Sequence, residues 1–232
     1  MQIQVNILSV EESWKHQLNI YETYHKKYSN IYPTANFFYH PYLLEKFSQP
    51  NLSPTEINKV ECYFKNKIYN KKHLENAKNI IIDEVIPFII NKNEILKQLP
   101  IKHPSSLTIN LSGAMSGGSY NAKNNYIKLS PQCVTKNFLP FLMVHEFTHI
   151  CVDDDIQKYK LPHIAKERLV SNICSQLLGF DDHNIIQDQQ LDKLITKNDL
   201  LTNYFSVLSN LQKLCSSNSQ TLPKPNNRNG CR

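Results

Sequence analysis

The residues best suited to chemistry lie in one short segment, F-L-M-V-H-E-F-T-H-I-C, which runs from Phe141 to Cys151. Within it, His145, Glu146 and His149 form the pattern H-E-x-x-H. A spacing of four residues places both imidazoles on one face of an α-helix, about one turn apart, where they can reach the same metal ion. Glu146 projects beside them and can take a proton from a water molecule on that metal. The pattern therefore predicts a metal-dependent hydrolytic site.

The residues around this pattern favour a buried helix. Apolar side chains flank the three polar ones on nearly every side, namely Phe141, Leu142, Val144, Phe147 and Ile150. Unpaired polar groups are costly to bury, so two histidines and a glutamate on such a helix need a partner. A zinc ion, Zn²⁺, would supply that partner. The alternative is a helical interaction protein in which the pattern is fortuitous.

A catalytic zinc ion usually has three protein ligands and one open position, so a third ligand is needed. Glu167 is the first candidate, because the polar segment before it can return a second helix antiparallel to the first. Asp155 is the alternative, reached by aligning H-E-F-T-H-I-C-V-D-D-D with H-E-x-x-H-x-x-G-x-x-(H/D). That alignment puts Val152 where a sharp turn needs glycine, which counts against Asp155. His163 is a third candidate on its chemistry alone.

The segment H-E-F-T-H, followed by Leu161, Pro162 and Glu167, resembles the gluzincin metalloproteases of the peptidase MA-like group. In that group the second helix typically begins L-P-x-W-x-x-E-G-x-A. Three positions depart from this pattern, with Ile164 for Trp, Arg168 for Gly and Val170 for Ala. The resemblance covers roughly residues 105–180, and these departures leave the subfamily unidentified.

The resemblance implies a role for each candidate residue. His145, His149 and Glu167 would hold zinc, and Glu146 would act as general base. Gluzincins often stabilise the oxyanion with a downstream tyrosine or histidine, for which Tyr204 and His183 are the candidates here. One turn after Glu167, either Ser171 or Asn172 is placed to hydrogen-bond a ligand histidine.

The implied function is a zinc-dependent endopeptidase that acts on a protein or peptide substrate. A composition rich in Lys, Asn and Ile is typical of AT-rich genomes, which suggests a bacterial effector or toxin-type protease. The alternative is a zinc-binding protein of the same fold without proteolytic activity, which would serve as an interaction or sensor protein. The intact Glu146 argues against that alternative.

The expected fold class is α+β and mostly helical. By the resemblance it is zincin-like, with a small mixed sheet whose edge strand lies beside the H-E-x-x-H helix, followed by the glutamate helix. Alternating residues in 107–111 and 126–129 predict two strands of a β-hairpin with a long loop. One of them would be the edge strand that binds extended peptide by strand addition.

Helix boundaries can be predicted at several positions. Pro140 should open the metal helix, and the acids at 153–155 should close it, because acidic side chains are unfavourable at a helix C-terminus. Pro87 should kink or split a helix over residues 72–99. Ser53-Pro54-Thr55-Glu56 predicts a helix start with a capping box.

Three regions are expected along the chain. Residues 1–104 form an N-terminal helical region, which is either a substrate-recognition lobe or packing for the rest. Residues 105–215 form the zincin-like catalytic region. Residues 216–232 are polar and are expected to be disordered.

Composition narrows the class of protein. The chain has 232 residues, of which 41% are hydrophobic and 20% charged, as in globular proteins. The net charge of +6 comes from scattered lysines without a dense basic block, so no nucleic-acid partner is expected. No run approaches about 18 apolar residues, so no membrane span is expected. No feature specifies an oligomeric state.

Cysteine usage and the N-terminal residues bear on the compartment. The six cysteines contain no C-x-x-C pair, which favours a reducing compartment over a disulfide framework. Residues 1–8 alternate polar and apolar side chains and lack the features of a cleavable signal. We therefore expect the cytoplasm of the producing cell, or export without a cleavable signal, for example into a host cell.

Overall fold

The computed structural model describes residues 1–30, 33–34, 37–38, 40–113, 118–131, 139–180 and 188–217. The strands are β1 (Gln2–Ile7), β2 (Ser106–Leu111), β3 (Gly118–Asn121) and β4 (Tyr126–Leu129). The helices are α1 (Val10–Thr23), α2 (Pro41–Phe47), α3 (Pro54–Tyr63), α4 (Lys71–Ile80), α5 (Ile86–Leu96), α6 (Leu139–Lys158), α7 (His163–Asn172), α8 (Gln189–Lys193), α9 (Lys197–Thr202) and α10 (Tyr204–Ser217). Turns of π-helix extend α1, α3, α4 and α7, at Tyr24–Tyr28, Phe64–Ile68, Ile81–Val85 and Ile173–Leu177.

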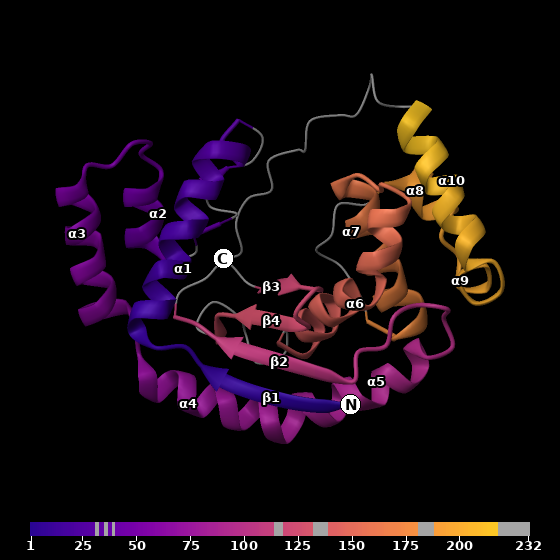
Figure 1. The fold of residues 1–232 in the computed structure, drawn as a ribbon, viewed down its shortest axis with the longest axis horizontal. Helices are drawn as coiled ribbons and strands as arrows, with labels where there is room; N and C mark the ends of the chain where they lie inside the picture. The colour runs from indigo at the N-terminus through magenta and orange to yellow at the C-terminus, as the bar shows by residue number, and fades with distance from the viewer. Residues whose placement is uncertain are drawn as a thin grey trace.

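The four strands form one mixed sheet in the order β1-β2-β4-β3 (Figure 1). β1 pairs with β2 and β2 with β4 in parallel, whereas β3 pairs with β4 antiparallel. A mostly helical α+β fold with a small mixed sheet is therefore confirmed. The predicted hairpin between residues 107–111 and 126–129 is wrong, because β3 forms within the expected loop and reverses the chain direction. The edge strand on this side of the sheet is β3, and neither predicted strand lies at an edge.

The sheet has one apolar and one polar face. On β2 and β4, Ile109 and Ile127 are fully buried, and they belong to the larger hydrophobic core. α4 contacts β1, and α6 contacts both β3 and β4. The opposite face carries the polar residues between them, such as Asn110 and Lys128, which are in register. We call this polar side the outer face of the sheet.

Two hydrophobic cores hold the molecule together. The larger one joins the inner face of the sheet to α4–α10, and the smaller one is rich in aromatic residues and lies among α1–α3. Trp14 and Phe47 are buried in the smaller core. After β1, the chain forms the smaller core first and enters the larger core at α4, whereas the sequence analysis placed the boundary between the N-terminal and catalytic regions at residue 104. β1, α4 and α5 therefore belong to the same core as the helices that follow residue 104.

The predicted helix signals in the first hundred residues are confirmed. Ser53 and Glu56 form a capping box, in which the Ser53 N–H donates to Glu56 Oε2 at 2.8 Å. The helix over 71–96 is interrupted by the π-turn Ile81–Val85, and Pro87 lies in the first turn of α5. In a regular helix the ring of a proline clashes with a carbonyl of the preceding turn. The wider π-turn before Pro87 avoids this clash.

The helix α6 is longer than predicted. It begins at Leu139, with Pro140 next, but it continues past the acids at 153–155 to Lys158. Two tyrosines from other elements stabilise these acids, since Tyr120 donates to Asp153 at 3.4 Å and Tyr204 donates to Asp155 at 3.2 Å. The prediction that the acids end the helix is therefore wrong. Among the described residues, no helix is both long enough and apolar enough to span a membrane.

The two faces of β2 can be tested by mutation. We expect Ile109→Ala to lower the free energy of unfolding by about 2–5 kcal/mol, because it leaves a cavity in the buried face. Thr108→Ala, on the outer face of the same strand, should lower it by less than about 1 kcal/mol. Urea unfolding followed by circular dichroism measures both, and equal losses would contradict the assignment of faces.

Candidate metal centre

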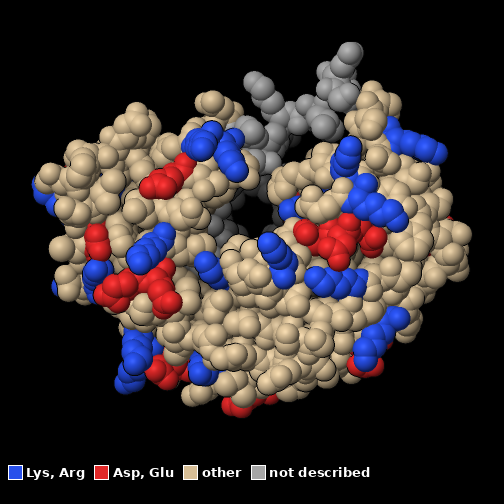
Figure 2. Space-filling model, viewed as in Figure 1, with Lys and Arg blue, Asp and Glu red and all other residues tan. Residues whose placement is uncertain are grey.

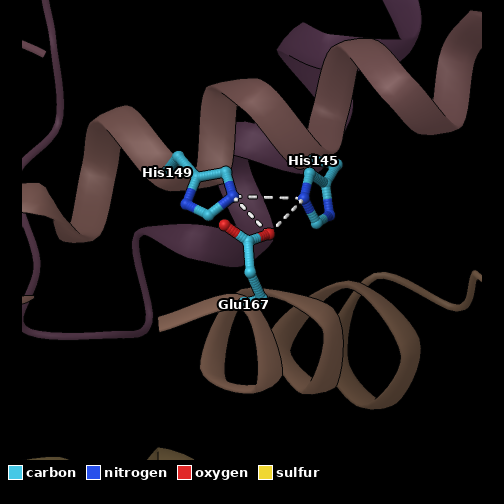
Figure 3. A group of neighbouring side chains, drawn as sticks. All are labelled: His145, His149 and Glu167. Carbon is cyan, nitrogen blue, oxygen red and sulfur yellow. Dashed lines mark hydrogen bonds and ion pairs between the residues drawn. The ribbon is translucent and has the colours of Figure 1, made fainter. Parts of the chain in front are cut away.

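Two helices from the larger core position the candidate site. α6 presents His145 and His149 one turn apart, and α7 packs against α6 after a tight turn. Lys160 adopts a positive φ of 51° in that turn, which lets the chain reverse. Figure 3 shows Glu167 projecting from α7 toward the two imidazoles on α6. The return helix that the sequence predicts thus brings Glu167 to the histidines.

Three ligand-type atoms converge at this point. His145 Nε2 and His149 Nε2 are 3.1 Å apart, and Glu167 Oε2 lies 3.3 Å from His149 Nε2 and 3.4 Å from His145 Nε2. A tetrahedral zinc ion with bonds of about 2.0–2.1 Å keeps its ligand atoms about 3.3–3.4 Å apart. The three atoms therefore have the spacing of three corners of such a site, and the group could bind a metal ion.

Burial and hydrogen bonding set the charges of this group. Burial alone would raise the pKa of Glu167, but hydrogen bonds with His145 and His149 lower it well below its usual range, so the carboxylate is ionised. Burial lowers the pKa of His149 to about 4. Burial also opposes a charge on His145, but its hydrogen bonds with Cys174 and Glu167 outweigh this and raise its pKa. The short contact between the two Nε2 atoms requires a proton on one of them, and a metal ion would displace that proton.

The two oxygens of Glu167 have different neighbours. Oε2 faces the imidazoles, whereas Oε1 lies 3.0 Å from Lys166 Nζ and 3.6 Å from His163 Nδ1. The His163 side chain is 63% exposed and lies on the far side of the carboxylate from the two ligand-type nitrogens. His163 is therefore not part of the converging group, and Lys166 holds the oxygen that points away from it.

Ring packing holds the two histidines in place. Tyr120 on β3 stacks on His149, with ring centroids 4.7 Å apart and planes 6° from parallel, and Phe141 packs against His145. Both Nδ1 atoms are buried and have no hydrogen-bond partner among the described residues. Within the described residues, ring packing rather than a hydrogen bond at Nδ1 thus orients the two imidazoles.

The predicted hydrogen bond from Ser171 or Asn172 to a ligand histidine is absent among the described residues. Asn172 donates instead to the Arg168 carbonyl and to Asp192, which also forms an ion pair with Arg168. Ser171 Oγ is buried and has no partner in the described part of the chain. Asn172 and Arg168 thus share Asp192 as a partner, which engages the Asn172 side chain away from the histidines.

Glu146 lies against the edge strand β3. Its side chain is packed so closely on Gly118 of β3 that an added Cβ there would lie 2.8 Å from Glu146 Cγ and Oε1. Burial raises the pKa of Glu146 to about 7, and nearby His145 opposes this shift. A buried carboxylate with this pKa, beside a metal-binding group, can both accept and release a proton near neutral pH.

The remaining candidates do not join this group. Asp155 accepts the hydrogen bond from Tyr204, and it lies six residues beyond His149, about 9 Å further along the helix axis. The hydroxyl of Tyr204 is thus engaged at Asp155, and Tyr204 itself is buried. His183 lies outside the described residues. The oxyanion-stabilising role of Tyr204 and His183 stays a prediction.

Three residues near the site were missed by the sequence analysis, namely Gly118, Tyr120 and Lys166. Gly118 and Tyr120 lie in a glycine-containing segment that was interpreted as a loop. Lys166, which precedes Glu167 in the sequence, has a side chain that is only 19% exposed. The only sequence signal for β3 was a short polar segment between the two predicted strands, and such a segment can form a strand as well as a loop.

Comparison of the chain with protein-family models, with curated proteins and with solved structures gave no match. The function is therefore inferred from the geometry of α6, α7 and β3. That geometry comprises two imidazole nitrogens, one carboxylate oxygen and an adjacent buried carboxylate.

Metal binding can be tested with variants of the two alternative third ligands. After incubation with zinc and removal of excess metal, we expect about one zinc ion per wild-type chain. Glu167→Ala should lose this zinc, because it removes one of three ligands, whereas Asp155→Ala should keep it. Elemental analysis measures both, with circular dichroism as the control for folding. Loss in Asp155→Ala with retention in Glu167→Ala would contradict the assignment.

Proposed function

We propose that this protein is a zinc-dependent endopeptidase of the gluzincin type, which hydrolyses peptide bonds in a polypeptide substrate. The observation that carries the proposal is the triangle of His145 Nε2, His149 Nε2 and Glu167 Oε2. Its spacing fits zinc, and its donor set of two histidines and one glutamate is that of known zinc peptidases. Glu146 lies next to this triangle, as hydrolysis requires.

Each residue of the group has a distinct task in this reaction. His145, His149 and Glu167 would hold the ion, and Lys166 would keep Glu167 turned toward it. When bound, zinc supplies Lewis acidity to a water molecule and to the carbonyl of the peptide bond. Glu146 accepts the proton of the attacking water and then passes it to the leaving amine. Gly118 allows Glu146 to lie close to the strand along which the substrate would bind.

The edge strand β3 suits an extended polypeptide. Among the described strands it pairs only with β4, so its other side offers backbone groups to which a further strand could pair. Gly118 and Tyr120 on this strand contact Glu146 and His149 respectively. A peptide added to β3 would therefore run past the candidate catalytic group.

A second candidate function is zinc binding without proteolysis, as in a sensor or interaction protein. The hydrogen bond between Tyr204 and Asp155 favours it, because the described candidate for an oxyanion donor is engaged elsewhere. The buried Glu146 beside the metal-binding group favours the endopeptidase, because binding alone does not need this carboxylate. We therefore place the endopeptidase first.

Hydrolysis can be separated from metal binding at Glu146. We expect Glu146→Gln to retain zinc and to lower kcat for an unfolded protein substrate by about 10²–10⁴-fold, since it removes the general base but no ligand. Release of peptides, measured by mass spectrometry, reports the activity. Undiminished hydrolysis by Glu146→Gln would disprove the role of this residue, and zinc-loaded wild type without any hydrolysis would favour the non-proteolytic alternative.

Gly118 offers a second test of the same geometry. Gly118→Ala places a Cβ within 2.8 Å of the Glu146 side chain, so we expect this carboxylate to move while zinc stays bound. A displacement of this size should lower kcat by about 10–100-fold. Lys123→Ala, at an exposed position in the turn between β3 and β4, is the matched control. Equal kcat values for the two variants would argue against the contact.

A further inference from the structure

A cavity of about 430 Å³ lies between α1 and the outer face of the sheet. α1 contributes Lys15, His16 and Asn19 to its walls, and the sheet contributes Asn110 and Lys128. Figure 2 shows that basic and acidic side chains are interspersed over the face of the molecule that it draws. The metal-binding group accounts for none of these residues, so the cavity needs an explanation of its own.

The charges in this cavity favour an anion. Lys15 and Lys128 form no ion pair with any described residue, and Lys128 Nζ lies 5.5 Å from the centroid of the Tyr126 ring. Glu12, the carboxylate in the wall, accepts the Ser9 N–H at 2.8 Å and attracts both lysines from further away, so the two lysines and one carboxylate leave a net positive charge. Burial lowers the pKa of Lys128, which indicates an ammonium group that has lost part of its hydration. A carboxylate in the cavity would restore a partner to this group.

His16 adds an unsatisfied polar group to the same wall. Its Nε2 is buried and has no hydrogen-bond partner among the described residues. Burial lowers the pKa of His16 to about 4, so the ring is neutral at pH 7 and can donate a hydrogen bond without adding charge. Buried polar atoms normally have partners, and a polar ligand in the cavity is one way to supply this one.

The register of the sheet connects the cavity to the edge strand. Lys128 on β4 lies directly opposite Ser119 on β3, and Asn110 lies on the other side of Lys128 in the same row. Residues alternate between faces along a strand. Ser119 therefore points to the cavity side, whereas Gly118 and Tyr120 point to Glu146 and His149.

A polypeptide bound along β3 would follow the same alternation. Every second side chain would lie on the face that Ser119 and Lys128 share. Neighbouring strands are about 4.8 Å apart, so the added strand would lie about 10 Å from β4. A glutamate on that strand and Lys128 could meet across this distance, because Ser119 between them is small.

We propose that this cavity is a subsite for an acidic side chain of the polypeptide substrate, and that Lys128 is the residue that selects it. The inference rests on the proposed endopeptidase function. Lys15 on α1 supplies the second positive charge. The substrate class is thus a polypeptide with Asp or Glu at the position that lies beside Ser119.

The test uses the zinc-loaded full chain and a peptide library of unbiased sequence. Cleaved peptides are identified by mass spectrometry and resynthesised with Glu, Gln or Lys at each position near the cleaved bond. We expect one position at which Glu gives a kcat/KM about tenfold higher than Gln, the equivalent of about 1.4 kcal/mol. The preference should shrink only modestly at high salt, because salt screens partly buried charges less than exposed ones.

Variants identify the residue that makes the selection. Lys128→Gln should remove the preference for the Glu peptide over the Gln peptide, and Lys128→Glu should favour the Lys peptide. Lys15→Gln, which lies outside the sheet, should weaken the preference and guards against a folding defect in the strand variants. Lys123→Gln, an exposed lysine in the β3–β4 turn, is the control that keeps the preference.

The outcomes separate the two proposals. A library that stays uncleaved overturns the endopeptidase proposal and this inference with it. Cleavage without an acidic preference, or a preference that survives in Lys128→Gln, overturns the inference alone. Inhibition by free glutarate that depends on Lys128, in the absence of any peptide preference, also overturns it and makes the cavity a site for a free small anion.

Discussion

The convergence of two imidazole nitrogens and one carboxylate oxygen is the constraint on which the arrangement of α6, α7 and β3 depends. His149 is 2% exposed, and the helix that carries it belongs to the larger core. Desolvation of such groups is unfavourable unless each charge has a partner. Lys166 beside Glu167 supplies part of that compensation, and a metal ion would supply the rest. The apolar packing of α6 stabilises a site that would not form on its polar groups alone.

Side-chain contacts join the edge strand to this site at two adjacent inward positions. Gly118 lies against Glu146, and Tyr120 stacks on His149 and lies beneath the ammonium group of Lys166. Strand, metal helix and glutamate helix therefore meet within a few residues of one another. A shift of β3 would therefore disturb the positions of Glu146 and His149 together.

The sequence was most informative where local geometry decides the structure. Helical spacing alone brings His145 and His149 together, and the polar turn after α6 returns Glu167 to them. It failed where distant contacts decide, because β3 lacks apolar alternation and is held by α6, so its segment was interpreted as a loop. The acids at 153–155 stay helical for the same reason, since hydrogen bonds from Tyr120 and Tyr204 outweigh their unfavourable position. Sequence spacing contains no information about such distant partners.

The side chains of β3 point alternately to the two faces of the sheet, and this bears on the role of residues 1–104. From the sequence, that region could serve either substrate recognition or packing. β1, α4 and α5 complete the core beneath the site, so they serve packing. α1 belongs to the separate aromatic core and forms a wall of the cavity on the outer face. If that cavity selects substrate, the inward residues of β3 serve catalysis and the outward ones serve recognition. Substitutions in α1 or at Lys128 could then change the selectivity without disturbing His145, His149 and Glu167. The backbone of β3 separates the side chains that face the cavity from those that face the metal-binding group.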